Sequence, residues 1–177
     1  MSQDRRERLE TSRLICERLR ADHADELPRL LQDPRVARTL SATGEPPTRA
    51  ELVDTLGEKI VHWDRLGFGL WLVRDRETGQ MIGQGGLQTT FVADCNEVEV
   101  AWAIVPERWG HGLATELAQA AMGVAFDDLG LHQVVAFTLP DNHASRRVMD
   151  KSGFVFEREI LHAGLPHVFY RGRAPTR

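Results

Sequence analysis

Cysteine is scarce in this sequence, and histidine does not gather into metal-type spacings. The two cysteines, Cys16 and Cys95, lie far apart and in no metal-ligand pattern. The 7 histidines are scattered, and no HxxxH pair shares one helical face. We therefore expect no structural or catalytic metal, and we expect reduced thiols that act as packing residues in a cytoplasmic protein.

Long apolar runs and a strong charge imbalance are also lacking. No run approaches the roughly 20 apolar residues that span a bilayer. The charged segment Met1 to Glu10 lacks the apolar core of a secretion signal. The formal net charge of −4 provides no general attraction to nucleic acid or to an anionic membrane. We therefore expect a cytoplasmic protein that binds neither nucleic acid nor a membrane.

The length and composition of the chain fit one folded unit. Its 177 residues include 42% hydrophobic and 27% charged residues, which are ordinary values for a globular protein. No repeat, low-complexity tract or linker rich in Gly, Ser or Pro divides the chain. We predict a single domain over residues 1–177, with a core at about residues 11–171.

The predicted secondary structure alternates between strands and helices. Asp22 is a predicted N-cap before a stripe of leucines, and Thr48 with Glu51 forms a capping box. This order predicts an α/β (α+β) fold with a mixed sheet and helices on both of its faces. The expected elements are strands at residues 14–19, 68–73, 81–90, 98–104, 134–137, 154–160 and 168–171, and helices after Asp22, Thr48, Gly112 and Asn142.

The strongest local signal is the segment Ile104–Glu116, which reads IVPERWGHGLATE. A strand ends there, a short loop carries Gly110 and Gly112, and a helix begins at once. Glycines permit tight turns and the close approach of a ligand, and the first amides of a helix have no internal partners. The segment is therefore either a cradle for a pyrophosphate or only a tight connection between two elements.

Two familiar phosphate-binding motifs do not account for this segment. A Walker loop needs Gly-Lys-Ser or Gly-Lys-Thr, and a dinucleotide fingerprint needs a third glycine where Thr115 stands.

The second signal is Asn142–Phe154, NHASRRVMDKSGF, which begins with a typical helix N-cap. Neighbouring parallel strands before the two helices would direct both helix N-termini to one cleft.

Together the two segments resemble motifs A and B of the GNAT acetyltransferases. The signature of that family is Q/R-x-x-G-x-G/A, followed by an Asn-led helix that ends in Gly-Phe, and Gly112 and Ala114 occupy its G-x-G/A positions. The segment TSRLICERLRADH adds a similarity to the RimJ/RimL branch, and the resemblance extends from about Thr11 to Tyr170. It implies a GNAT-like acyl-CoA N-acyltransferase fold with a central, mostly antiparallel, splayed sheet.

The resemblance also implies how acetyl-CoA, the expected co-substrate, would bind. Main-chain groups of the strand before the turn would pair with the pantetheine amides, as an added strand does. Amides of the turn would hold the pyrophosphate, and the nearby arginines would either meet phosphates or be solvated. The expected contacts are Trp102, Ala103, Ile104, Arg108, Trp109, Gly110, His111, Gly112, Leu113, Ala114, Thr115, Asn142, Ser145 and Arg147.

Two positions depart from the family pattern. Trp109 stands where the consensus has Gln or Arg, which leaves one phosphate contact to the main chain. Met149 stands where many members have a Tyr that protonates the leaving thiolate, and a thioether cannot donate a proton. Ser145 shares a helical face with Met149 and is predicted to hydrogen-bond the sulfur from a cleft that Met149 also lines. The alternative is that the Ser145 side chain hydrogen-bonds the open amides or carbonyls of the first helical turn.

An ammonium must lose a proton before it attacks a thioester, so a base is expected. Strand alternation places Glu99 beside Ala101 and Ala103, on a face that a helix should cover, and a partly desolvated carboxylate has a raised pKa. Glu99 is the predicted base, with a structural ion pair or solvent exposure as its alternative. His162 and His167 either line the acceptor mouth or, the better interpretation, are exposed.

The predicted function is an N-acetyltransferase that moves acetyl from acetyl-CoA to a primary amine by direct attack in a ternary complex. The acceptor is a protein N-terminus or a small amine such as a polyamine, an amino acid or an antibiotic. The alternative function is a non-catalytic sensor that binds acyl-CoA. Met149 favours the sensor, whereas Glu99, Asn142 and Ser145 favour the enzyme. Monomer and homodimer both remain open.

Overall fold

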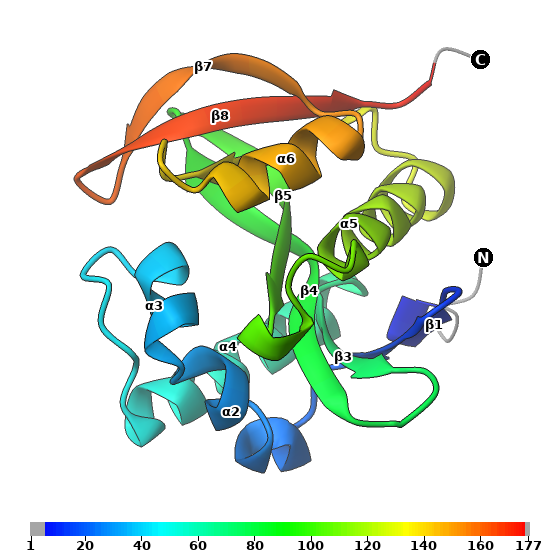
Figure 1. Ribbon diagram of the computed structural model, residues 1–177. Coiled ribbons are helices and arrows are strands. Elements are labelled where there is room, and N and C mark those ends of the chain that lie inside the picture. Colours follow the sequence, from blue (N-terminus) through cyan, green and yellow to red (C-terminus); the bar gives the residue numbers. More distant parts are fainter. Residues whose placement is uncertain (1–5, 176–177) are drawn as a thin grey trace.

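The computed structural model describes residues 6–175, which form a mixed sheet with helices packed against it (Figure 1). The 8-stranded sheet has the order β1-β2-β3-β4-β5-β6-β8-β7. Its neighbouring strands are antiparallel except β5 and β6, which are parallel. The strands are β1 (Arg8–Glu10), β2 (Leu14–Arg18), β3 (Leu70–Asp75), β4 (Met81–Val92), β5 (Cys95–Ile104), β6 (Gln133–Thr138), β7 (Val155–His162) and β8 (Leu165–Arg173).

Two of the predicted helix starts are confirmed in detail. The Thr48 side chain accepts from the Glu51 N–H, and the Glu51 carboxylate accepts from the Thr48 N–H at 2.7 Å. The Asn142 side chain accepts from the Ser145 N–H at 3.2 Å. The helices are the 3₁₀ turn η1 (Ala21–Asp25), α2 (Pro28–Leu31), α3 (Pro34–Leu40), α4 (Arg49–Leu66), the 3₁₀ turn η2 (Pro106–Arg108), α5 (Leu113–Gly123) with its π-helical continuation η3 (Val124–Asp128), and α6 (His143–Lys151).

The segment after β2 differs from the prediction. Asp22 is not an N-cap, because η1 begins after Arg20, whose N–H donates to Nδ1 of His23 at 3.2 Å. The expected single helix is instead divided into η1, α2 and α3. Pro28 and Pro34 stand at the starts of α2 and α3, where a proline is accepted because its missing N–H would have no partner there.

The strands β4 and β5 are each longer than predicted, and they form one hairpin. Its strands extend to Val92 and start at Cys95, and they are joined by Ala93 and Asp94 with φ values of 51° and 64°. Cys95 is exposed at this end, so the prediction of a packing role is wrong for it. Cys16 is buried in the main core, as expected, and burial raises the pKa of its thiol to about 12.

Strands β5 and β6 diverge from a single point of contact. They share one register pair, Glu99 with Val135, whereas β5 pairs with β4 along its whole length. Beyond Glu99 the β5 edge that faces β6 therefore has no strand partner among residues 6–175, which confirms the splayed sheet. Because β5 and β6 are parallel, α5 and α6, which follow them, begin at the same end of the sheet (Figure 1).

Helices α4 and α5 cover opposite faces of the central strands. A Cβ on Gly85 of β4 would lie 2.7 Å from Cδ2 of Leu117, so this face of β4 packs against α5. Gln88 points to the opposite face by strand alternation, and it lines a cavity together with side chains of α4. Within residues 6–175, no helix is both long and apolar enough to cross a membrane.

Candidate active site

The glycine turn between β5 and α5 has the geometry of an anion cradle. Gly110 and Gly112 have φ values of 80° and 76°, in the left-handed region that glycine adopts without strain. Gly112 is also the N-cap of α5 and has no side chain to cap it. Within the described chain, no N–H from residues 110–115 donates a hydrogen bond. These amides, at the positive end of the helix dipole, are available to a phosphate anion.

A distant segment holds this turn in place. Arg13 Nη1 donates to the His111 carbonyl oxygen at 2.8 Å. In a trans peptide the N–H points opposite to the C=O, so this bond directs the Gly112 N–H away from Arg13. Glu116 anchors the arginine by accepting from its Nε at 2.7 Å, and it also accepts from the Thr11 hydroxyl at 2.6 Å. Burial acts to raise the pKa of Glu116, but these hydrogen bonds outweigh it and lower the pKa.

Sequence reasoning did not assign a role to Arg13. The residue lies in the TSRL segment that contributed to the family resemblance, yet nothing in that segment indicates its partner. The contact joins residues separated by 98 positions in the chain, so only the folded structure brings them together.

Antiparallel pairing determines which groups of β5 are open to a ligand. The Val105 N–H donates to the Ile82 carbonyl at 2.9 Å, and main-chain groups alternate in direction along such a strand. By this alternation the N–H and C=O of Ala103 point to β4, whereas those of Trp102 and Ile104 point to the gap beside β6. The expectation that Ala103 pairs with a ligand through its main chain is therefore wrong.

Trp109 and Arg108 brace the turn instead of facing a ligand freely. The Trp109 indole N–H donates to the Ile104 carbonyl at 2.7 Å, so that oxygen is already used. Arg108 forms an ion pair with Asp75, which occupies the guanidinium that we expected near the phosphates. His111 Nδ1 lies 2.9 Å from the Trp109 carbonyl oxygen. The side chains of Trp109 and His111 are both exposed.

At the start of α6, Asn142 is a structural cap. Its Oδ1 accepts from the Ser145 N–H, and its Nδ2 donates to the Thr138 hydroxyl at 2.9 Å. The half-buried Ser145 hydroxyl forms no hydrogen bond with the described chain, so it does not itself cap the helix. Met149 is 1% exposed and lies in the main core, so the prediction that it lines a cleft is wrong. Arg147 is exposed and has no ion-pair partner within residues 6–175.

Glu99 lies where β5 and β6 part, on the face that α4 covers. Its cross-strand partner is Gln88, whose Nε2 donates to Oε2 of Glu99 at 2.8 Å. Burial raises the pKa of Glu99 to about 7, and the hydrogen bond from Gln88 acts in the opposite direction. Two structural roles were the alternatives for Glu99, an ion pair and solvent exposure. Neither applies, because no ion pair joins Glu99 to another described residue and its side chain is only partly exposed.

Two histidines gather at the end of β6. His162 and His167 are half-buried, whereas we expected them to be exposed. Their ring centroids lie 4.8 and 5.7 Å from that of Phe137 on β6 and 5.5 Å from each other. Burial lowers the pKa of His162, and the positive charge of His167 acts in the same direction. The two rings and Phe137 therefore pack as one aromatic cluster, in which burial disfavours the charged form of His162.

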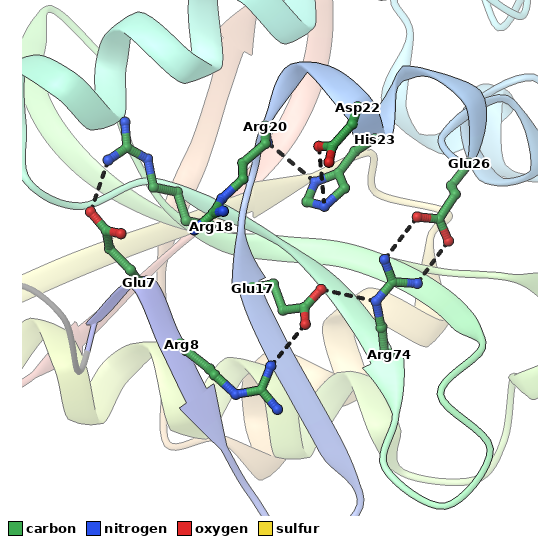
Figure 2. Close-up of a pocket in the computed structure, with 9 residues that line it drawn as sticks. All are labelled: Glu7, Arg8, Glu17, Arg18, Arg20, Asp22, His23, Glu26 and Arg74. Carbon is green, nitrogen blue, oxygen red and sulfur yellow. Dashed lines mark hydrogen bonds and ion pairs between the residues drawn. The ribbon is translucent and has the colours of Figure 1, made fainter.

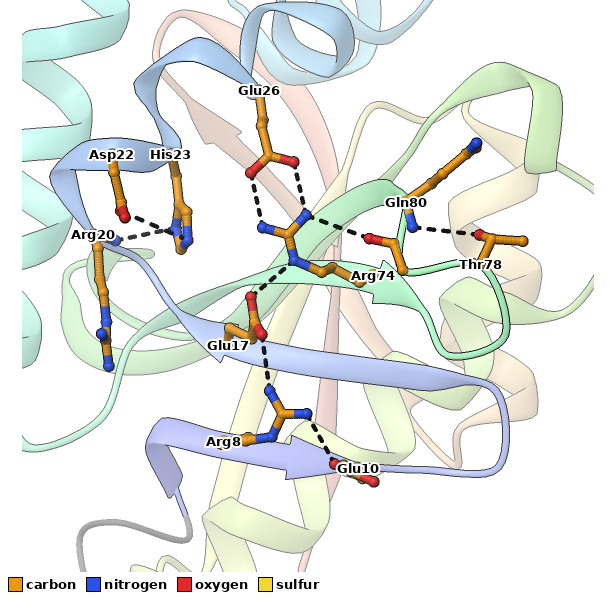
Figure 3. A network of polar contacts seen from close by, with 11 residues as sticks. Arg8, Glu10, Glu17, Arg20, Asp22, His23, Glu26, Arg74, Thr78 and Gln80 are labelled. Carbon is orange, nitrogen blue, oxygen red and sulfur yellow. Dashed lines mark hydrogen bonds and ion pairs between the residues drawn. The ribbon is translucent and has the colours of Figure 1, made fainter.

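A larger cavity, of about 540 Å³, lies among β1, β2, β3 and η1 (Figure 2). Most of its arginines already have carboxylate partners. Arg74 donates to both oxygens of Glu26 at 2.7 and 2.8 Å and to Glu17 at 2.9 Å, and Arg8 also donates to Glu17 (Figure 3). This network neutralises its own charges and braces η1 against the sheet edge. We therefore place the candidate active site at the glycine turn and at Glu99.

Comparisons with curated proteins identify relatives of moderate similarity. YkkB, an uncharacterized protein of Bacillus subtilis, is 27% identical over 119 residues, which cover 64% of this chain and 69% of YkkB. The FsC-acetyl coenzyme A-N(2)-transacetylase of Aspergillus fumigatus is 29% identical over 157 residues, which cover 82% of this chain. The matched part spans only 63% of that transacetylase.

Solved structures share the fold over nearly the whole chain. A protein of Bordetella pertussis described as a GNAT-family acetyltransferase has a TM-score of 0.82 and 26% identity, and covers 96% of this chain and 100% of its own. RimL, a ribosomal L7/L12 alpha-N-protein acetyltransferase in complex with coenzyme A, has a TM-score of 0.74 and 15% identity, with 92% and 95% covered. The family model described as an acetyltransferase (GNAT) domain matches residues 13–155. This chain therefore belongs to the GNAT acetyltransferase family.

Proposed function

We propose that this protein transfers the acetyl group of acetyl-CoA to a primary amine by direct attack in a ternary complex. The observation that carries the proposal is the juxtaposition of free amides at residues 110–115, an unpaired β5 edge, and a carboxylate with a pKa of about 7 where the strands part. A pyrophosphate site, an extended binding edge and a base are the three parts that this reaction needs.

The residues present fit acetyl-CoA. The amides of Gly110–Thr115 would hold the pyrophosphate, and the open groups of Trp102 and the Ile104 N–H would pair with the pantetheine amides. Asn142 retains a second N–H on Nδ2 beside its bond to Thr138, which leaves it able to donate to the pantetheine arm. Arg147 is a cation without an ion pair within the described chain and would meet a phosphate.

Glu99 would begin the reaction by accepting a proton from the acceptor ammonium, directly or through a water. The amine nitrogen then forms a bond to the thioester carbonyl carbon, and the bond from that carbon to sulfur breaks. The nitrogen loses its second proton, and the departing thiolate takes up one proton. Ser145, whose hydroxyl has no partner in the described chain, would hydrogen-bond the sulfur and relay a proton from water.

The second candidate function is an acyl-CoA sensor without turnover. The observation in its favour is Met149, which occupies the position of the usual Tyr and lies in the core, where it can neither donate a proton nor reach a ligand. A thiolate is a moderate leaving group, so this loss slows an acetyltransferase without disabling it.

Thiol release distinguishes the two functions. Acetyl-CoA is incubated with the protein and a panel of amines and N-terminal peptides, and free thiol is measured against Glu99→Gln as the control. Amine-dependent release that the variant loses supports the transferase. Tight calorimetric binding of acetyl-CoA with no release for any amine would instead identify the sensor.

A further inference from the structure

A second cavity lies directly beside Glu99. It measures about 230 Å³ and opens between α4 and the strands β3 and β4. Gln88, the residue that donates to Glu99 at 2.8 Å, forms part of its wall. A group bound in this cavity is therefore separated from the proposed base by one side chain. The lining residues are Thr55, Glu58, Lys59, His62, Leu70, Gln88 and Thr89.

Lys59 contributes an unneutralised positive charge to this cavity. Within residues 6–175 no carboxylate lies within ion-pair distance of its ammonium. Burial lowers the pKa of Lys59 to about 8, although the neighbouring Glu58 acts to raise it. The group thus remains largely protonated at neutral pH while it has lost much of its hydration. The arginines of the larger cavity contrast with it, because most are already bonded to carboxylates (Figures 2 and 3).

Apart from the exposed carboxylate of Glu58, the other polar groups of the cavity are hydroxyls, an amide and a histidine ring. His62 donates from Nδ1 to the Phe68 carbonyl at 2.9 Å, and its Nε2 accepts from the Thr89 N–H at 3.2 Å, so both ring nitrogens already have partners. Glu58 is exposed and is the only acidic side chain among the described residues that line the cavity. One ammonium among hydroxyl and amide groups matches a single negative charge, and a phosphate dianion would need more cations.

We propose that this cavity binds a carboxylate of the acceptor, with Lys59 as its counter-ion, so that the acceptor is an amine of the amino-acid type. The proposal rests on the proposed acetyl transfer and names its substrate class. A carboxylate held at Lys59 would direct the amino group of the same molecule toward Gln88, which contacts Glu99. A polyamine would instead bring a second positive charge toward Lys59 and would be repelled.

Matched pairs of acceptors test this inference. Thiol release from acetyl-CoA is measured with glycine, β-alanine and the protein amino acids, each against its own amide. The amide has the more easily deprotonated amine, so a preference for the acid cannot come from amine reactivity. For at least one pair, we expect kcat/KM to be 10-fold or more higher for the acid. Equal or better use of every amide by the wild-type protein would overturn the inference.

Three variants assign any preference to the cavity. Lys59→Met removes the charge and should raise KM for the acid 10-fold or more, with kcat changed less than 3-fold and the amide unaffected. Lys59→Arg should retain part of the preference. Arg65→Met removes a cation from an exposed position of the same helix and should change neither substrate. A preference that persists in Lys59→Met would refute the role of Lys59.

Binding separates this inference from the proposed function. N-acetylglycine and its amide are titrated calorimetrically into the CoA-saturated protein and into Lys59→Met, whose folding is checked by its melting temperature. If no amine supports thiol release, the proposed function fails, and a Lys59-dependent affinity for the carboxylate still decides the inference. If only amines without a carboxylate are acetylated, the function stands and the inference fails.

Discussion

Replacing Glu99 by glutamine should lower turnover and raise stability at alkaline pH, because both effects arise from one half-buried carboxylate. The substitution keeps the shape of the side chain and an oxygen that accepts from Gln88, but it cannot take a proton. Turnover should fall by about 100-fold, the usual effect of losing a general base. In the wild-type protein, kcat/KM should rise with pH through an apparent pKa near 7, and the variant should lack that limb.

The stability effect follows from the direction of the pKa shift. The folded protein raises the pKa of Glu99 from 4.5 to about 7, so the folded state holds this proton more tightly than the unfolded state does. The resulting stabilisation is complete below pH 4.5 and is lost as the pH rises to 7. Above pH 7 the ionised carboxylate destabilises the protein by at most about 3–4 kcal/mol relative to a neutral side chain.

Thermal unfolding at several pH values measures this difference. The melting temperature of Glu99→Gln should exceed that of the wild-type protein by up to about 10 °C at pH 8, with the difference shrinking toward pH 4.5. Other titrating groups are common to both proteins and cancel in the comparison. A difference that does not vary between pH 4.5 and 8 would show that Glu99 is hydrated, and the argument for a poised base would fail.

Three further predictions concern the cofactor site. Gly112→Asp should weaken CoA binding more than 10-fold, about 1.4 kcal/mol or more. Gly112→Asn is the control, because asparagine tolerates the same left-handed backbone and carries no charge, so it should weaken CoA binding less. Equal calorimetric affinities for the two variants would place the pyrophosphate elsewhere. Arg13→Met should raise the Kd for CoA about 10-fold by releasing the His111 carbonyl, and an unchanged Kd would mean that the turn needs no brace. Ser145→Ala should reduce turnover about 10-fold with an unaltered melting temperature, and the reverse pattern, a loss of about 0.5–2 kcal/mol in stability with full turnover, would assign it a capping role.

The local parts of this fold could be predicted from the sequence because their signals lie between near neighbours. The alternation in residues 98–104 identified a strand and the face of Glu99, and the Thr48–Glu51 pair identified the start of α4. The glycines at 110 and 112 indicated the turn whose amides are open. Prolines disturbed the one helix that was predicted wrongly, because each of them allowed a new helix to begin.

The sequence by itself thus determined most of the strands and helices, the glycine turn and the position of Glu99. Tertiary structure alone decided which groups meet. Arg13 donates to the carbonyl oxygen of His111, and Lys59 lines the same cavity as Gln88. Strand register also turned the main chain of Ala103 toward β4, and helix packing placed Met149 in the core. These outcomes depend on strand order, register and helix packing, which join distant parts of the chain and leave no mark on the local pattern of residues.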